Sequence, residues 1–233
     1  MPTEEEIYTL HASQYDRLIQ REDFQKNILR TIQKITPLST LDVIDLGSGT
    51  GRFTQLLAPI THSILAMDLF PHMLREAKKS LYQTIDNNWM ITVCDNARLP
   101  VRKGSIDLVI SGWSFCYLAV WSGDNWKSAL QNGLEEIKRV LHKGGIIIIL
   151  ETMGTGFETP HPPQHLANYF EFLKEMGFSS TWIRTDYKFE SLAEAEELSS
   201  FFFGEELTAK VRENQWIILP ECTGVWWFEI IQE

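Results

Sequence analysis

The sequence predicts an α/β fold, doubly wound, in which helices cover both faces of a mostly parallel sheet. From residue 42 onward, short apolar strands alternate with helices, and this alternation is typical of such sheets. The run 146–150, Ile-Ile-Ile-Ile-Leu, is continuously apolar, as expected of a central strand that is buried on both faces. Glycines stand at positions 47, 49 and 51, just after the first strand, where the strands of these folds end and ligands bind.

The first half of the chain gives its elements in a clear order. Thr3 and Glu6 form a capping box that opens a helix reaching Ile19. A second helix begins near Glu22, and Pro37 ends it. We expect strands at 42–46, 63–68, 90–94, 106–111 and 145–151, and helices at 51–58, 71–83 and 124–142.

The second half is less regular. A loop rich in glycine and proline is expected at 152–163, then a helix at 164–176 and a strand at 180–185. Ser191 and Glu194 form another capping box, and 225–231 reads as a terminal strand. We find no linker or repeat, and so expect one domain over 1–233. In it, 1–36 forms an N-terminal helical cap, and 186–222 is an insertion between the last two strands.

Composition narrows the possible partners. The 233 residues carry a net charge of −10, and most of the acidic excess lies in 186–233. Binders of nucleic acid usually show a basic stripe instead. The three cysteines are widely spaced and fit a reducing compartment better than a disulfide framework. No apolar run approaches the ~18 residues of a membrane span, and the N-terminus lacks a hydrophobic signal core. We therefore expect a cytoplasmic protein that binds neither nucleic acid nor membrane.

The spacing of the glycines separates two classes of nucleotide site. A dinucleotide fold requires Gly-x-Gly-x-x-Gly, but Arg52 or Thr54 stands where the third glycine belongs. The pattern Asp-x-Gly-x-Gly-x-Gly, from Asp45 to Gly51, instead resembles the cofactor loop of class I S-adenosylmethionine-dependent methyltransferases. Three later segments also resemble this family: the strand that ends in Asp68, the element 95–100, and the stretch 105–145 with its strand, helix and Gly-Gly turn.

The resemblance implies a Rossmann-like sheet of seven strands, with the last strand inserted antiparallel beside the fifth. It also implies S-adenosylmethionine as the cofactor. Asp68 would bind the ribose hydroxyls, Asp95 or Asn96 the adenine amino group, and Asp45 the methionine ammonium. The full cofactor site carried over from the family is Asp45, Gly47, Ser48, Gly49, Gly51, Asp68, Leu69, Met73, Asp95, Asn96, Ala97, Ser111 and Tyr15.

Each of these residues also has a purely structural interpretation. The glycines suit a plain strand-to-helix turn. Asp68 is placed to cap the helix near Pro71, and Asp45 to brace the loop. Asp95 and Asn96 are common turn formers. Tyr15 suits ordinary helix packing.

The acceptor side is less defined. In the family, the acceptor pocket follows the fourth strand, which here gives Trp113, Cys116 and Tyr117, although these side chains also suit packing against the helix at 124–142. His161 is a weak candidate for a general base, since a single loop histidine is often merely solvated. The insertion 186–222 is expected to cover the acceptor pocket, where its acids would favour a neutral or cationic substrate, or to form a dimer surface.

These observations predict transfer of a methyl group from S-adenosylmethionine to O, N or C of a small molecule, with no metal and with a monomeric or homodimeric protein. The sequence lacks the Asn/Asp-Pro-Pro-Tyr/Phe tetrapeptide and the Pro-Cys nucleophile of nucleic-acid methylation. Two alternatives remain open. One is an NAD(P)-dependent oxidoreductase, and the other is a non-catalytic protein that binds S-adenosylmethionine.

Overall fold

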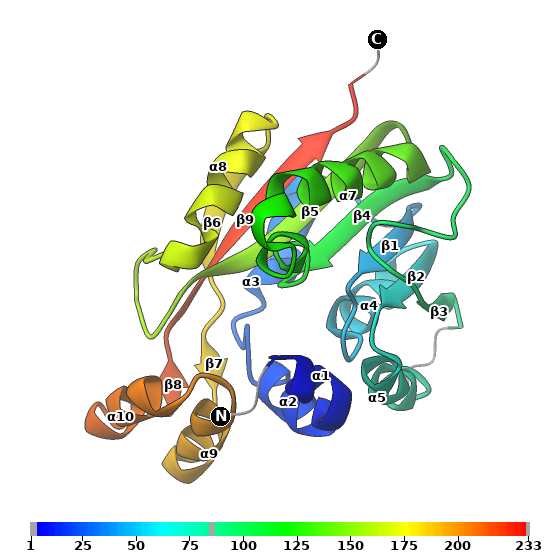
Figure 1. Cartoon of the computed structure of the whole chain (residues 1–233). Helices are drawn as coiled ribbons and strands as arrows, with labels where there is room; N and C mark the ends of the chain where they lie inside the picture. Colours follow the sequence, from blue (N-terminus) through cyan, green and yellow to red (C-terminus); the bar gives the residue numbers. More distant parts are fainter. Residues whose placement is uncertain (1–3, 84–86, 232–233) are drawn as a thin grey trace.

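A seven-stranded sheet runs through the centre of the molecule (Figure 1). The structure, a computed structural model, describes residues 4–83 and 87–231. The strand order is β3-β2-β1-β4-β5-β9-β6, and only β9 runs antiparallel to its neighbours β5 and β6. The strands are β1 (Asp42–Leu46), β2 (Ser63–Asp68), β3 (Trp89–Val93), β4 (Ile106–Gly112), β5 (Leu141–Thr155), β6 (Ser179–Arg184) and β9 (Glu221–Glu229). The expected fold class is therefore confirmed, including the antiparallel last strand beside the fifth.

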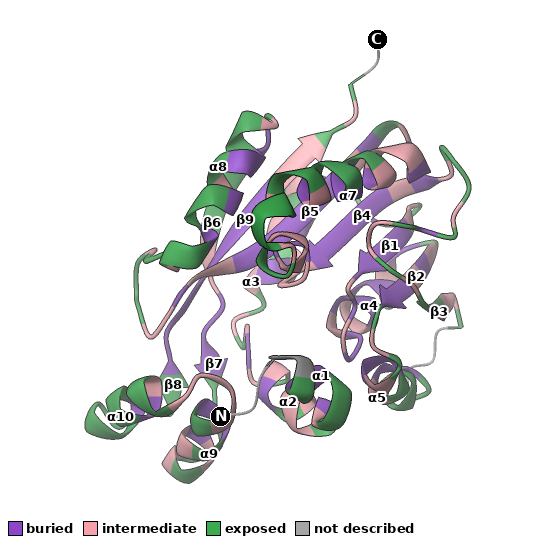
Figure 2. Ribbon diagram, in the orientation of Figure 1, coloured by how far each residue is buried: buried purple, intermediate pink, exposed green. Residues whose placement is uncertain are grey.

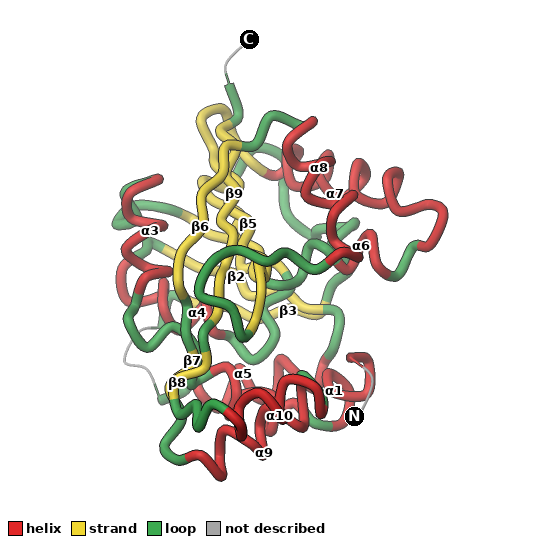
Figure 3. Tube along the Cα trace, turned by 90° about the vertical axis from the view of Figure 1, so that its left-hand side faces the viewer, coloured by secondary structure: helices red, strands yellow, loops and turns green. Residues whose placement is uncertain are grey.

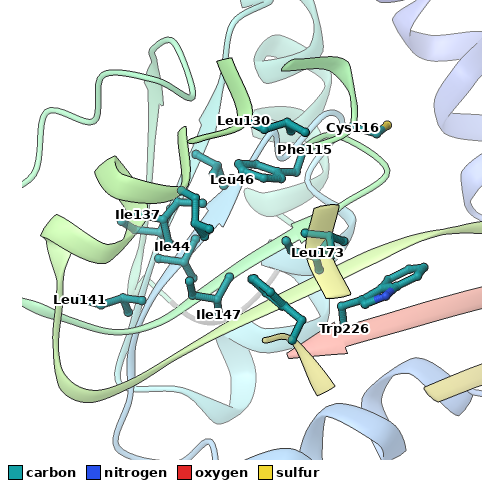
Figure 4. Packing of buried hydrophobic residues seen from close by; sticks show 14 of the residues in the cluster. Ile44, Leu46, Phe115, Cys116, Leu130, Ile137, Leu141, Ile147, Leu173 and Trp226 are labelled. Carbon is teal, nitrogen blue, oxygen red and sulfur yellow. The ribbon is translucent and has the colours of Figure 1, made fainter. Parts of the chain in front are cut away.

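Helices cover both faces of this sheet. Leu130 and Ile137 of α7 (Trp126–Val140) pack with Ile44 and Ile147 on one face (Figure 4). Ile28 and Ile32 of α3 (Asn27–Ile35) pack with Val43 and Ile148 on the other. Figure 2 shows the central strands β1, β4 and β5 largely buried between these layers. The helices of the main body are α3 (Asn27–Ile35), α4 (Arg52–Leu57), η1 (Ala58–Ile60), α5 (Pro71–Leu81), α6 (Tyr117–Val120), η2 (Gly123–Asn125), α7 (Trp126–Val140), η3 (Gln164–Leu166) and α8 (Ala167–Glu175). Within the described ranges, no helix has the length and apolarity needed to cross a membrane.

The fifth strand is longer than its sequence indicates. β5 reaches Thr155, whereas 145–151 is the apolar run and a loop was expected from Thr152. The extension pairs with β9, with an irregularity between Thr152 and Thr155. Hydrogen bonds to the neighbouring strand thus continue the strand beyond the apolar residues that predict it.

The N-terminal segment forms two helices where one was expected. α1 (Glu4–Leu10) and α2 (Ala12–Ile19) are separated at His11, whose backbone has φ −123° and ψ 25°. The His11 ring packs against Phe201 with a centroid separation of 5.8 Å. This break depends on contacts distant in sequence, which local helix signals do not carry. Thr3, the first residue of the expected capping box, lies outside the described residues.

The insertion forms a small helical unit at the end of the molecule where α1 and α2 lie (Figure 3). It contains β7 (Tyr187–Lys188), α9 (Leu192–Phe202), α10 (Glu205–Glu213) and β8 (Ile218–Leu219). Ser191 Oγ accepts a hydrogen bond from Glu194 N at 3.2 Å, so Ser191 caps α9 as expected. The Glu194 side chain, however, accepts from Glu190 N at 2.7 Å rather than from Ser191 N, so the expected capping box forms only in part. Leu18 of α2 is buried in the apolar cluster of this unit, so the insertion packs onto the N-terminal helices.

Candidate functional site

A cavity of about 270 Å³ lies at the carboxyl ends of β1, β2 and β4. Its walls come from the glycine turn, from the ends of β2 and β4, and from α1, α2 and α6. The lining residues are Tyr8, Tyr15, Ile19, Gly47, Ser48, Gly49, Thr50, Arg52, Phe53, Asp68, Leu69, Phe70, Met73, Asp95, Asn96, Gly112, Trp113, Ser114, Tyr117, Leu118, Trp121 and Ser122. Nine of the expected cofactor residues belong to this set: Tyr15, Gly47, Ser48, Gly49, Asp68, Leu69, Met73, Asp95 and Asn96.

The glycine turn brings bare backbone to the cavity. Gly47 and Gly49 have φ values of +69° and +55°, which side chains rarely allow. A Cβ on Gly47 would lie 1.7 Å from Ser114 Oγ, because the Ser114 side chain rests against this backbone. Glycine at position 47 therefore allows both the backbone conformation and the close contact between the first and fourth strand ends.

Asp68 ends β2 and is only 7% exposed. Its Oδ2 accepts a hydrogen bond from Gly49 N at 2.8 Å, and its Oδ1 accepts one from Phe70 N at 2.8 Å. Burial raises the pKa of this carboxyl, while the two amides act in the opposite direction. These bonds fix the carboxylate against the glycine turn, and each oxygen still has a lone pair for a ligand hydroxyl.

Asp95 and Asn96 lie at the next strand end, beside Ser114. Asp95 Oδ1 accepts a hydrogen bond from Ala97 N at 2.8 Å, so Asp95 both lines the cavity and forms a turn. Asn96 Nδ2 donates to Ser114 Oγ at 3.3 Å. Leu69, half exposed, and Met73, buried, are the apolar lining residues next to these polar groups.

Four expected cofactor residues are not in the cavity wall: Asp45, Gly51, Ala97 and Ser111. Asp45 is fully buried, and its Oδ2 accepts hydrogen bonds from Thr54 N at 2.9 Å and from Thr54 Oγ1 at 2.6 Å. Burial raises the pKa of Asp45 to about 7, although the Thr54 bonds lower it. The structure thus places Asp45 where it braces the start of α4, as its structural interpretation proposed.

Only some of the residues expected in the acceptor pocket line the cavity. Trp113 and Tyr117 line the cavity, whereas Cys116 is buried in the core and its backbone N–H donates to Glu151 Oε1 at 3.1 Å. Trp113 has a φ of +50°, an uncommon conformation for a bulky residue. Its ring stacks on Phe53 at a centroid separation of 6.3 Å.

Several cavity residues were missed by sequence reasoning. Tyr8 OH and Tyr117 OH are 2.8 Å apart, so a hydrogen bond links α1 to α6. Phe70 and Trp121 complete a group of four neighbouring rings with these two tyrosines. Of these missed residues, Arg52 could have been predicted from the sequence, because it directly follows the last glycine of the turn. The others depend on how distant segments meet.

His161 and the insertion lie elsewhere. The His161 ring stacks on Phe157 at a centroid separation of 4.2 Å, and neither it nor the rest of 152–163 lines the cavity. The expectation that 186–222 covers the acceptor pocket is wrong for this structure, since none of its residues belongs to the wall. It contacts α2 and the turn after it instead, through the ion pairs Arg17–Glu197 and Arg21–Glu194, both at 2.8 Å.

Three polar atoms of the cavity wall are available to bind a polar ligand. Among the described residues, Ser48 Oγ, Asn96 Oδ1 and Arg52 Nη2 are buried and have no hydrogen-bond partner. Buried polar atoms are normally satisfied, so a ligand with donors and acceptors fits here. The described part of the chain contains no group of three or more His, Cys, Asp or Glu that could hold a metal ion.

Comparison with known proteins identifies a methyltransferase domain within the chain. The model of a methyltransferase domain matches residues 44–149. Demethylmenaquinone methyltransferase of Lactococcus lactis is 28% identical over 159 residues, which cover 64% of this chain and 58% of that protein. Malonyl-[acyl-carrier protein] O-methyltransferase of Geobacter sulfurreducens is 32% identical over 106 residues, 45% of this chain and 36% of that protein. The chain thus aligns with only part of the length of these relatives.

A solved structure shares the fold. Haemonchus contortus phosphoethanolamine N-methyltransferase 2, in complex with phosphomonomethylethanolamine and S-adenosylhomocysteine, has a TM-score of 0.59 at 15% identity, covering 90% of this chain and 53% of that one. Residues 44–149 thus match a methyltransferase domain, and the chain has the Rossmann-like fold of the class I S-adenosylmethionine-dependent methyltransferases, whose cofactor is S-adenosylmethionine.

Proposed function

We propose that this protein transfers a methyl group from S-adenosylmethionine to a small-molecule acceptor. One observation carries the proposal: a single cavity joins the glycine turn and Asp68 to a half lined by aromatic rings. The cofactor, when bound, supplies a methyl group already activated on a sulfonium. The protein then has to position the acceptor in line with that methyl group and exclude water.

We propose the following roles for the cofactor residues. Asp68 accepts hydrogen bonds from the ribose hydroxyls, because its oxygens are fixed at the edge of the glycine turn. Asp95 and Asn96 contact the adenine, and Asn96 Oδ1 has no partner within the described ranges. The backbone of Gly47 to Gly49 lies against the methionine part, with Met73 beside Gly49.

The acceptor then lies in the aromatic half of the cavity, among Tyr8, Trp113, Tyr117 and Trp121. The bond between the two tyrosine hydroxyls holds α1 over this half. We further propose that 1–233 is one domain in which the insertion supports α2 from outside the cavity, since Leu18 packs within the apolar cluster of the insertion.

Two assays test the proposal. Calorimetric titration with S-adenosylhomocysteine and with NADH separates a methyltransferase site from a dinucleotide site, and we expect binding of the first only. A screen of small molecules with methyl-labelled S-adenosylmethionine then identifies acceptors. Binding of NADH without binding of S-adenosylhomocysteine would overturn the proposal, and cofactor binding without any turnover would favour a non-catalytic protein.

A further inference from the structure

The charges in the cavity wall are unevenly placed. The carboxylates among the described lining residues are Asp68, at the end of β2, and Asp95, just after β3. Both lie in the part of the cavity that we assign to the nucleoside of the cofactor. The remaining lining residues supply rings, hydroxyls, an amide, apolar side chains and one cation, Arg52, and among those that the structure describes there is no further Asp or Glu and no His, Lys or Cys. We call the part lined by Tyr8, Trp113, Tyr117, Leu118, Trp121 and Ser122 the aromatic half.

Arg52 contacts Trp113, one of the rings of the aromatic half. Its Cζ lies 4.7 Å from the centroid of the Trp113 ring, and its Nη1 donates to Glu22 Oε2 at 2.6 Å. Glu22 is buried, does not line the cavity, and also accepts a hydrogen bond from Thr185 Oγ1 at 3.2 Å. Arg52 Nη2 has no partner in the described part of the chain. The guanidinium is therefore fixed on one side by Glu22 and keeps a free donor on the other.

The side chains of the aromatic half determine which acceptors can react, because this half, among its described residues, offers no carboxylate or imidazole as a general base. An alkyl amine is protonated near neutral pH and must lose a proton before its lone pair attacks, a step that a positioned base assists. An ionised oxygen needs none: its lone pair forms the O–CH₃ bond while the S–CH₃ bonding pair passes to sulfur. The negative charge of the acceptor and the positive charge of the sulfonium disappear together, and no proton moves. An aromatic wall without a carboxylate or imidazole suits this reaction.

We propose that the acceptor is a small planar molecule that presents an ionised oxygen acid to the aromatic half of the cavity, and that Arg52 selects for this charge. The inference rests on the proposed methyltransferase function and deepens it. The acids of 186–222, which were expected to favour a neutral or cationic substrate, do not line the cavity and so do not oppose this selection.

Three probes of matched ring size test the charge preference: benzoate, benzylamine and benzyl alcohol. Each is titrated calorimetrically into wild-type protein saturated with S-adenosylhomocysteine. We expect benzoate to bind at least tenfold more tightly than the other two. Benzylamine binding as tightly as benzoate, or more tightly, would overturn the inference while leaving the cofactor site intact. Failure of S-adenosylhomocysteine itself to bind would instead count against the proposed function.

The role of Arg52 needs a variant that leaves no buried charge unpaired. The double change Arg52→Gln/Glu22→Gln removes both charges, and we expect the preference for benzoate over benzyl alcohol to fall below threefold. The matched control is Arg139→Gln/Glu136→Gln, which removes an ion pair of 2.7 Å on α7 outside the cavity and keeps the preference. Arg52→Lys retains a positive charge beside Glu22 and should keep part of the preference for benzoate over benzyl alcohol.

The cofactor carboxylate is the other anion that Arg52 could bind, and 5′-methylthioadenosine, which lacks the amino-acid part, separates the two roles. We expect the double variant to bind 5′-methylthioadenosine within threefold of wild type. It should also lose benzoate selectivity when 5′-methylthioadenosine occupies the site. If the variant loses affinity only for S-adenosylhomocysteine and keeps full benzoate selectivity, Arg52 binds the cofactor and its assignment to the acceptor is wrong.

Discussion

Replacement of Asp68 by asparagine tests the cofactor site with little change in shape. The carboxylate is 7% exposed and fixed by Gly49 N and Phe70 N, both at 2.8 Å. Asparagine keeps one acceptor oxygen and removes the charge and the second acceptor. Hydrogen bonds to charged groups contribute about 1.5–3 kcal/mol each. Loss of one ribose bond and weakening of the other should therefore cost about 2–3 kcal/mol of S-adenosylhomocysteine binding, about 30- to 150-fold in Kd.

The stability of the unbound protein should change much less. Burial raises the pKa of Asp68, so removing its charge relieves a desolvation cost and offsets part of the hydrogen bonding that is lost. We expect the free energy of unfolding to change by about 1 kcal/mol. Asp107→Asn is the matched control, because Asp107 lies near the amino end of β4 and its Oδ2 accepts a hydrogen bond from Asp42 N at 2.7 Å, outside the cavity.

Isothermal titration calorimetry of the three proteins with S-adenosylhomocysteine gives the affinities, and urea denaturation gives the stabilities. The reasoning predicts a large loss of affinity for Asp68→Asn alone. An affinity within threefold of wild type for this variant would refute the assignment of Asp68 to the ribose.

Substitutions at Gly47, Glu221 and Tyr8 test further contacts of the fold. Gly47→Ala should destabilise the fold by about 2–4 kcal/mol in urea denaturation, from a φ of +69° and the Ser114 contact. Adding Ser114→Gly should recover part of that loss, and no recovery would contradict the packing argument. Burial raises the pKa of Glu221 to about 8. The folded state therefore binds more protons than the unfolded state between pH 5 and 8, and the free energy of unfolding falls as pH rises through this range. Glu221→Gln should reduce that slope by up to about 1.4 kcal/mol per pH unit, and an unchanged slope would show that Glu221 does not cause it. Tyr8→Phe removes the hydrogen bond to Tyr117 and should speed hydrogen exchange in residues 4–10. The control Tyr82→Phe, at an exposed position, should not change this exchange. Equal exchange in both variants would exclude the bond as a restraint on α1.

The central strands could be predicted from the sequence because their signals are local. β1 and β2 match the expected ranges 42–46 and 63–68 to the residue, since apolar runs end there in the glycine turn and in Asp68. Parallel strands bring their carboxyl ends to one edge, and therefore Gly49, Asp68 and Asn96 meet in one cavity without further information.

The rest depends on contacts between distant segments. The cavity position of Tyr8 is set by the break at His11 and by the bond to Tyr117, 109 residues away. Residues 186–222 pack on α2 through Leu18 rather than over the cavity, because the connection rules fix the end of the sheet but not the neighbour that buries an apolar face. His161 lies outside the wall, and its backbone N–H donates to Met153 O at 2.6 Å, so it is held beside the extended end of β5.

A crystal structure of the protein with S-adenosylhomocysteine would test the central claim most directly, since it shows how the ligand is oriented in the cavity. The account predicts both ribose hydroxyls within hydrogen-bonding distance of Asp68, adenine beside Asp95 and Asn96, and the sulfur facing Trp113 and Tyr117. A ligand bound outside this cavity, or bound with its sulfur turned away from the aromatic half, would contradict it.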